Sequence, residues 1–242
     1  MITIQSLSKH YGRQKVLDGV DLTVSDGVLF ALLGPNGSGK TTLLKSLLGI
    51  VAPDPSGEII FNNRSILGKK SYKRHVGYMP QNPKFPPHLK VRELVTLFEK
   101  LRQKKGVHKE KLAADLQIDR FWHKPFGELS GGMSQKVNIL LCFMFETSLL
   151  ILDEPTLGLD PSITFYLKQL MREKKTEGKT VLFTSHVMAE VEEIADRMAL
   201  LVEGKIYTVI APQEMMRQRK SKTLEEALHL FWNKTNPDEK NI

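Results

Sequence analysis

The chain has 242 residues, of which 41% are hydrophobic and 26% charged, so it has ample length for one α/β core with a smaller lobe and little for two independent domains. Its formal net charge of +8 leaves nucleic acid, nucleotide phosphates and an anionic membrane surface open as partners, beside the plain alternative of a solvated basic surface. The single cysteine, Cys142, excludes an internal disulfide and fits a reducing compartment.

Neither the start of the chain nor its interior carries a membrane segment that we would expect to insert. The first residues lack the apolar core of a signal peptide. The longest apolar stretch, 139–152, is interrupted at 146–148 and is too short to span a bilayer. We therefore expect any membrane role to depend on a partner.

Strand and helix patterns alternate along the first part of the chain. Alternating or continuous short apolar runs predict strands, and apolar residues spaced three and four apart predict helices. The expected strands are 2–7, 20–24, 28–33, 58–61 and 76–79, and the expected helix is 41–50.

Residues 91–145 read differently, as a mostly helical segment in which one face is lined by Leu94, Leu97, Phe98 and Leu101. After this segment a strand, a helix, a strand, a helix and a hairpin are expected at 149–152, 161–177, 180–184, 187–195, and 198–202 with 205–209. This order favours a parallel sheet covered by helices, with a helical insertion.

The end of the chain has a helix signal of its own. Thr223 and Glu226 form a capping-box pattern. One apolar stripe follows, made of Leu224, Ala227, Leu228 and Phe231. Residues 233–242 are expected to be frayed.

A phosphate-binding loop is the strongest motif. It reads Gly34-Pro35-Asn36-Gly37-Ser38-Gly39-Lys40-Thr41 and stands between an expected strand and an expected helix, as the pattern G-x-x-x-x-G-K-[ST] requires. Its glycines let backbone N–H groups point inward at phosphate oxygens, and the helix adds its positive dipole end. Lys40 would reach the β/γ-phosphates and the Thr41 hydroxyl would ligate Mg²⁺. The plain alternative is a glycine-rich turn that arose by chance.

A second motif is the buried strand at 149–152, which ends in Asp153 and Glu154. Ligands bind at the carboxyl ends of parallel strands. Asp153 would hold Mg²⁺, and Glu154 would orient or deprotonate the attacking water. Alone, this pattern equally fits a strand that ends in a solvated turn; beside the phosphate-binding loop it indicates phosphoryl transfer.

A third motif points to a family. Residues 129–135, Leu-Ser-Gly-Gly-Met-Ser-Gln, resemble the ABC signature L-S-G-G-Q. Over 2–210 the chain resembles ATPases of the ATP-binding-cassette (ABC) family in further elements. These are Tyr11 as the aromatic residue that stacks on adenine, Gln81 of the Q-loop, Gly158-Leu159-Asp160 as the D-loop, and His186 as the switch histidine after the last core strand.

The resemblance implies the fold and its division. The fold would be an α/β P-loop ABC cassette, with a mainly parallel RecA-like core, an antiparallel β subdomain and a helical signature subdomain. The core with its β subdomain would comprise 1–83 and 147–210, the helical subdomain 84–146, and a C-terminal helical extension 211–242.

The resemblance also implies ATP hydrolysis with Mg²⁺ and assigns the site. Lys40, Gln81, Glu154 and His186 would be catalytic, and Thr41, Gln81 and Asp153 would serve Mg²⁺. ATP would contact Tyr11, Val16, Gly34, Pro35, Asn36, Gly37, Ser38, Gly39, Lys40, Thr41 and Thr42. A second copy would reach the same ATP through Ser130, Gly131, Gly132 and Met133, and Asp160 would belong to the D-loop.

The implied assembly is a homodimer of this chain with an integral membrane permease, on the cytoplasmic face of the inner membrane, with no nucleic acid. Two residues depart from the common pattern. Met133 replaces the usual glutamine of the signature, and Lys136 stands where arginine is frequent. Because the serine and glycines of the signature remain, we expect activity to survive, and any ribose or cross-interface contact of the usual glutamine would be changed at Met133.

A closer resemblance lies in residues 77–87, 134–138 and 184–190, which look like the ATPase subunit of Nos-type ABC exporters. That exporter supports copper-site assembly of nitrous-oxide reductase with a membrane subunit and a periplasmic copper-handling protein. The alternatives are another exporter, for drugs, lipids or polysaccharides, or a soluble ABC ATPase that acts on ribosomes or DNA. A catalytically dead nucleotide-binding module is disfavoured by the presence of Lys40, Glu154 and His186.

Overall fold

The computed structural model describes residues 2–235, which fall into two compact units. Of the described residues, the first unit comprises 2–68 and 184–235, and the second comprises 69–183. This division differs from the one expected from sequence, because strands on either side of the helical segment group with its helices. No helix within residues 2–235 is long and apolar enough to cross a membrane.

The first unit contains an antiparallel sheet in the order β2-β1-β4-β5. Its strands are Ile2–Tyr11 (β1), Gln14–Val24 (β2), Glu58–Phe61 (β4) and Arg64–Ser65 (β5). β1 and β2 extend beyond the expected ranges because they form one hairpin, in which Tyr11 pairs with Gln14 across the turn. Several bulges interrupt the apolar alternation in this hairpin, so the pattern alone understated its length.

The same unit contains a pair of parallel strands, Leu29–Leu33 (β3) and Arg197–Val202 (β9), and β9 pairs antiparallel with Lys205–Ile210 (β10). The hairpin expected around residues 203 and 204 is therefore confirmed. Every residue of β3 is buried, as its continuous apolar run predicts. Because β9 follows His186 in the chain, the strand before His186 is not the last parallel strand, which corrects the sequence-based expectation.

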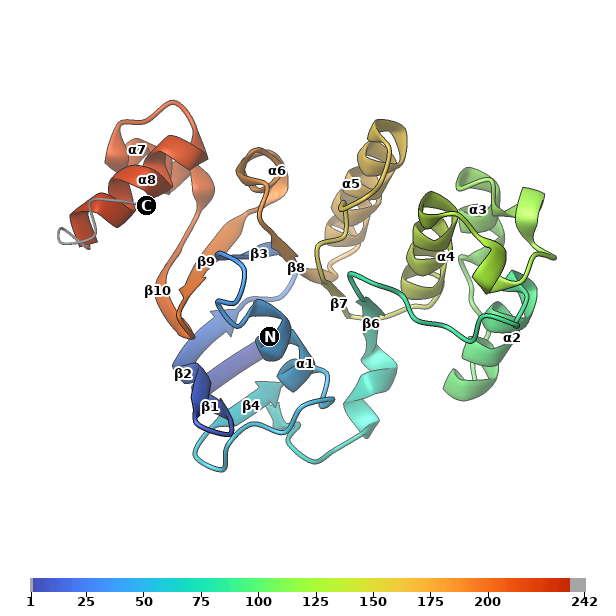
Figure 1. Cartoon of the computed structure of the whole chain (residues 1–242), viewed down its shortest axis with the longest axis horizontal. Coiled ribbons are helices and arrows are strands. Elements are labelled where there is room, and N and C mark those ends of the chain that lie inside the picture. Colours follow the sequence, from blue (N-terminus) through green and yellow to red (C-terminus); the bar gives the residue numbers. More distant parts are fainter. Residues whose placement is uncertain (1, 236–242) are drawn as a thin grey trace. The chain divides into compact units, whose positions relative to one another are not determined.

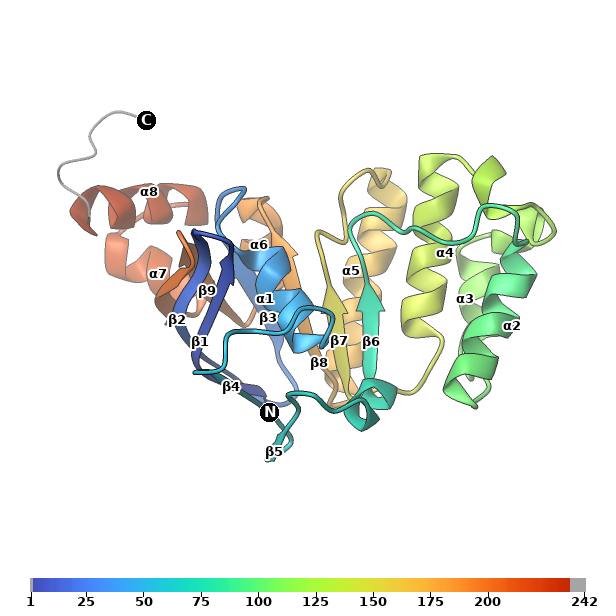
Figure 2. The ribbon, with the colours of Figure 1, turned by 60° about the horizontal axis from the view of Figure 1, so that its bottom comes forward.

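Helices complete the first unit: Lys40–Leu47 (α1), Met188–Ile194 (α6), Pro212–Arg219 (α7) and Leu224–Thr235 (α8). Figures 1 and 2 show α7 and α8 lying side by side after β10. Leu224 and Ala227 of α8 are fully buried, in agreement with the predicted apolar stripe.

The cap of α8 follows the predicted pattern only in part. The Glu226 N–H donates to the Thr223 hydroxyl at 3.2 Å, as a capping box requires. The Glu226 carboxylate, however, accepts from the backbone N–H of Lys222 at 2.9 Å, one residue earlier than the pattern places the bond. The helix continues to Thr235, so the prediction that residues 233–242 are frayed was wrong for residues 233–235. Residues 236–242 lie outside the described residues.

The second unit contains three parallel strands, Val76–Met79 (β6), Leu149–Leu152 (β7) and Thr180–Ser185 (β8), the last of which ends just inside the first unit. The helix Pro161–Thr176 (α5) connects β7 to β8. The helical segment between β6 and β7 contains the helices Val91–Arg102 (α2), Lys109–Asp115 (α3) and Gly131–Phe143 (α4), and the short 3₁₀ turns Ser71–His75, Ile118–Phe121 and Phe126–Glu128 complete the unit. Figure 2 shows α2, α3 and α4 side by side, as the predicted helical segment requires.

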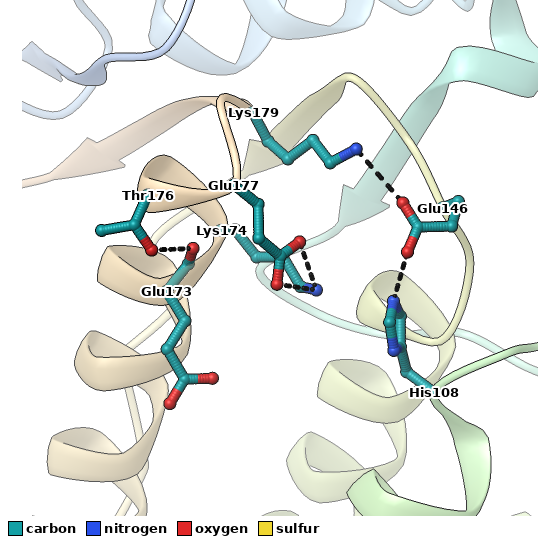
Figure 3. A network of polar contacts seen from close by, with 7 residues as sticks. All are labelled: His108, Glu146, Glu173, Lys174, Thr176, Glu177 and Lys179. Carbon is teal, nitrogen blue, oxygen red and sulfur yellow. Dashed lines mark hydrogen bonds and ion pairs between the residues drawn. The ribbon is translucent and has the colours of Figure 1, made fainter.

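Charged side chains tie together the loops that precede β7 and β8 (Figure 3). Glu146 lies 2.7 Å from the His108 ring nitrogen Nε2 and accepts from Lys179 Nζ at 3.1 Å. Hydrogen bonds from Lys179 and His108 hold the pKa of Glu146 below its ordinary value. Lys174 and Glu177 form a second pair at 2.9 Å. The Glu146 side chain is 41% exposed, so these contacts fix loop positions more than they stabilise the fold.

Candidate active site

The phosphate-binding loop lies between β3 and α1, and α1 begins at Lys40, as predicted. Close packing explains two of its glycines. A Cβ added at Gly34 would lie 2.0 Å from the backbone oxygen of Leu201, and one added at Gly39 would lie 2.8 Å from that of Val16. Gly39 also has a φ of 104°, in the region that favours glycine. The loop is thus shaped by β2 and β9, which lie far from it in sequence.

Lys40 and Ser38 give this loop a buried polar interior. Lys40 is only 6% exposed, and its Nζ donates to the backbone oxygens of Gly34 at 2.7 Å and Pro35 at 3.0 Å. The Ser38 hydroxyl is buried and has no hydrogen-bond partner among residues 2–235. A buried ammonium and an unsatisfied hydroxyl at a helix N-terminus fit a phosphate, whose oxygens accept from both.

Tyr11 lies at the end of β1 and is 49% exposed. The Lys9 ammonium sits 5.3 Å from the centre of its ring. Val16 is half-buried on β2, and its backbone oxygen backs the loop at Gly39. The exposed ring of Tyr11 therefore belongs to the same hairpin that shapes the phosphate-binding loop, as adenine stacking would require.

We expect Tyr11→Ala to weaken ATP binding about tenfold or more, because stacking of a base on an aromatic ring contributes roughly 1–3 kcal/mol. Tyr11→Trp keeps an aromatic face and should bind ATP nearly as well as the wild type. Equilibrium titration with an ATP analogue that carries a fluorophore on its ribose measures the affinity of both variants. Unchanged affinity in Tyr11→Ala would show that another group holds the base.

The two acids after β7 sit in different environments. Asp153 is 3% exposed, and its backbone N–H donates to the Met79 oxygen at 2.8 Å. Glu154 is half-buried with a φ of 47°, a left-handed conformation that costs a residue with a side chain about 1–3 kcal/mol. Its Oε2 accepts from the side-chain amide of Gln81 at 3.0 Å. The fold thus joins two predicted site residues that are 73 positions apart.

Tyr78, one strand away on β6, was not singled out from the sequence. Burial, with a smaller contribution from the negative charge of Asp153, raises the pKa of Tyr78 to about 12. The phenol therefore stays neutral beside this carboxylate at physiological pH. The sequence alone carries no signal for Tyr78. Its place beside Asp153 becomes visible only once β6 pairs with β7.

The signature residues open a helix, as predicted. Ser130 is the N-cap of α4, and its hydroxyl accepts from the backbone N–H of Met133 at 3.3 Å. Gly131 and Gly132 are exposed, and a Cβ added at either would meet nothing within 4 Å. Contacts with the part of the chain that the structure describes therefore do not explain glycine at these two positions.

Asp160 and His186 occupy turns. Asp160 caps α5, accepting from the backbone N–H groups of Ser162 and Ile163 at 3.0 Å each. The hydrogen bond from the Ser162 side chain, above all, lowers the pKa of Asp160. His186 is exposed between β8 and α6. The D-loop aspartate thus has a helix-capping contact that sequence reasoning did not anticipate.

The predicted site residues are divided between the two units. The phosphate-binding loop, Tyr11, Val16 and His186 belong to the first unit, whereas Gln81, Asp153, Glu154, the signature and Asp160 belong to the second. Inside each unit the structure joins Lys40 to its own loop and Gln81 to Glu154.

A glycine-rich loop between a buried strand and a helix that begins with lysine, together with a second buried strand followed by two acids, defines a P-loop nucleoside triphosphatase. The family model for ABC transporters matches residues 17–157. The chain therefore belongs to the ABC transporter family and is one of its ATP-binding cassettes, which hydrolyse ATP.

Named relatives cover most of the chain. It is 33% identical to Nod factor export ATP-binding protein I of Burkholderia orbicola over 89% of this chain and 72% of that protein. It is 34% identical to the lantibiotic transport ATP-binding protein SrtF of Streptococcus pyogenes over 85% of this chain and 89% of that protein. A solved structure of the ATP-binding subunit of an ABC transporter matches with 30% identity and a TM-score of 0.87, over 96% of this chain and 99% of that one.

Proposed function

We propose that this chain supplies the energy for export through a separate integral membrane permease, against which it sits on the cytoplasmic face. The similarity to ATP-binding proteins of Nod factor export and lantibiotic transport, which extends over at least 85% of the chain, carries this proposal. The exported species is selected by the permease, so the chain itself need not contact it.

The proposed chemistry is the one that the resemblance to ABC ATPases implies for these residues. Lys40 and the N–H groups of its loop would hold the β- and γ-phosphates. Glu154, held by Gln81, would accept a proton from the attacking water, and His186 would contact the γ-phosphate. Thr41, Gln81 and Asp153 would hold Mg²⁺, because their side-chain oxygens suit this ion. The bound ion would neutralise charge on the phosphates.

The copper-specific interpretation is not supported by the relatives reported above, which are named for Nod factor and lantibiotic export. It rests only on the resemblance of residues 77–87, 134–138 and 184–190 to Nos-type exporters. The periplasmic copper-handling partner rests on the same resemblance alone. We favour export of an organic molecule or peptide, since those are the cargoes that the relatives' names suggest.

We further propose that two copies of the chain complete each ATP site. Within residues 2–235, no atom lies close enough to the exposed Gly131 and Gly132 to exclude a Cβ. Glycine at these positions suits close approach of a phosphate bound to another copy, with the N-terminus of α4 directed at it. A two-fold axis would then form both sites together.

Mixing two inactive variants tests this arrangement. In a mixed dimer, the Lys40→Ala change of one copy and the Ser130→Arg change of its partner fall in the same composite site. If each site uses Lys40 from one copy and Ser130 from its partner, a mixed dimer keeps one intact site. Random pairing of equal amounts should then restore up to about a quarter of the wild-type ATPase rate.

The unmixed variants serve as controls and should stay inactive at the same total concentration. An ATPase rate that is linear in enzyme concentration down to a monomeric sample, with Ser130→Arg fully active, would show that each chain works alone. Co-purification of the wild-type chain with its native membrane partner tests the permease part of the proposal independently.

A further inference from the structure

Helix α4 carries a buried polar side chain that the roles above do not use. Asn138 is only 1% exposed, and its neighbours in the chain from Val137 to Phe143 are all buried and apolar apart from Asn138 itself. Burying an amide costs free energy unless its hydrogen bonds are made. The contacts of Asn138 therefore show what the side chain is placed to do.

Both hydrogen bonds of the Asn138 amide lead toward the Q-loop. Its Nδ2 donates to the backbone oxygen of Pro80 at 2.8 Å and to Oε1 of Gln135 at 3.1 Å. The second bond fixes the orientation of the Gln135 amide, whose Nε2 donates to the backbone oxygen of Gln81 at 3.0 Å. The two consecutive backbone carbonyls that follow β6, those of Pro80 and Gln81, are thus held by side chains from one turn of α4.

The same network continues to the proposed catalytic base. The side chain of Gln81 donates to Oε2 of Glu154 at 3.0 Å. Each link has a defined donor and acceptor, from Asn138 to Gln135, from Gln135 to the Gln81 backbone, and from the Gln81 side chain to Glu154. All four residues belong to the second unit.

We propose that Asn138 and Gln135 are positioning residues for ATP hydrolysis. They hold the backbone at Pro80 and Gln81 so that the Gln81 amide keeps the Glu154 carboxylate aimed at the attacking water. The inference rests on the proposed role of Glu154. Glu154 has a left-handed backbone conformation, and such a conformation persists only where surrounding contacts hold it.

Asn138→Leu tests the proposal, because leucine has a similar volume and no amide. We expect the maximal rate of ATP hydrolysis by the full-length chain to fall about tenfold, since small misplacement of a catalytic group slows chemistry strongly. KM and the equilibrium affinity for ATP should stay within about twofold of the wild type, because the ATP contacts proposed above do not include Asn138.

Leu140→Val is the matched control. Leu140 is fully buried on the same helix, and its side chain has no polar atom that could bond to the Q-loop. We therefore expect its shortening to lower thermal stability and to leave the rate unchanged. An equal loss of rate in Leu140→Val and Asn138→Leu would reduce Asn138 to a packing role and overturn the proposal.

Gln135→Met provides a second variant should Asn138→Leu fail to fold, because Gln135 is only half-buried. It should lower the maximal rate by a similar factor, again without changing KM. The double variant should lose no more than the worse single variant, since both act through one network.

Wild-type rates in folded Gln135→Met and Asn138→Leu, with Glu154→Gln inactive, would sink this inference and leave the assignment of the base intact. Full activity in Glu154→Gln would instead remove the base on which the inference rests.

Discussion

Glu154→Gln is expected to lower the ATP hydrolysis rate by at least about 100-fold, since a positioned general base typically contributes 10²–10⁴-fold. Glutamine has the same shape but cannot accept the proton of the attacking water. ATP affinity should stay close to that of the wild type, because the proposed phosphate contacts come from the loop at Lys40. Phosphate release and equilibrium ATP titration measure the two quantities separately.

Glu177→Gln is the control for this experiment. Glu177 belongs to the same unit and bonds to Lys174 at 2.9 Å, but it has no place in the proposed chemistry. Its replacement should leave the hydrolysis rate unchanged. If purified Glu154→Gln hydrolyses ATP at the wild-type rate, the general base must be another group, and the bond from Gln81 to Glu154 must serve structure.

The sequence predicted those elements whose own residues determine them. Continuous apolar runs located β3 and β7 within about a residue, because both strands are buried along their length. β6 was also located, although Tyr78 within it is only half-buried. β5 and the extension of β1 and β2 escaped prediction, since pairing with a partner strand makes polar residues such as Gln14 part of a sheet. The alternation of apolar and polar residues in a single segment does not predict such pairing.

The candidate site divides in the same way. The phosphate-binding loop and the two acids after β7 are local motifs, so their positions could be read directly. The hydrogen bond between Gln81 and Glu154, and those of Asn138 and Gln135, join segments from β6, α4 and the end of β7. The sequence shows Asn138 as a polar residue on the apolar face of a helix. The residues that accept its hydrogen bonds, however, can be identified only from the structure.

Lys40→Ala is expected to weaken ATP binding by about 30-fold or more, because truncating one partner of a buried charge interaction costs roughly 2–5 kcal/mol. The loss should exceed that of a surface lysine, since Lys40 is 6% exposed and the surroundings screen its charge poorly. ATP hydrolysis should be abolished at ATP concentrations that saturate the wild type. Equilibrium titration with ATP and phosphate release check the two parts.

Lys45→Ala gives the matched control on the same helix. Lys45 lies in the last turn of α1, away from the positive end of the helix dipole, and is half-buried. Its removal changes the net charge by the same amount as Lys40→Ala, so any general electrostatic effect of the basic chain appears in both variants. Thermal unfolding of both variants separates lost binding from lost folding. Equal ATP affinities for Lys40→Ala and Lys45→Ala, with both chains folded, would show that the loop holds phosphate through its backbone N–H groups alone.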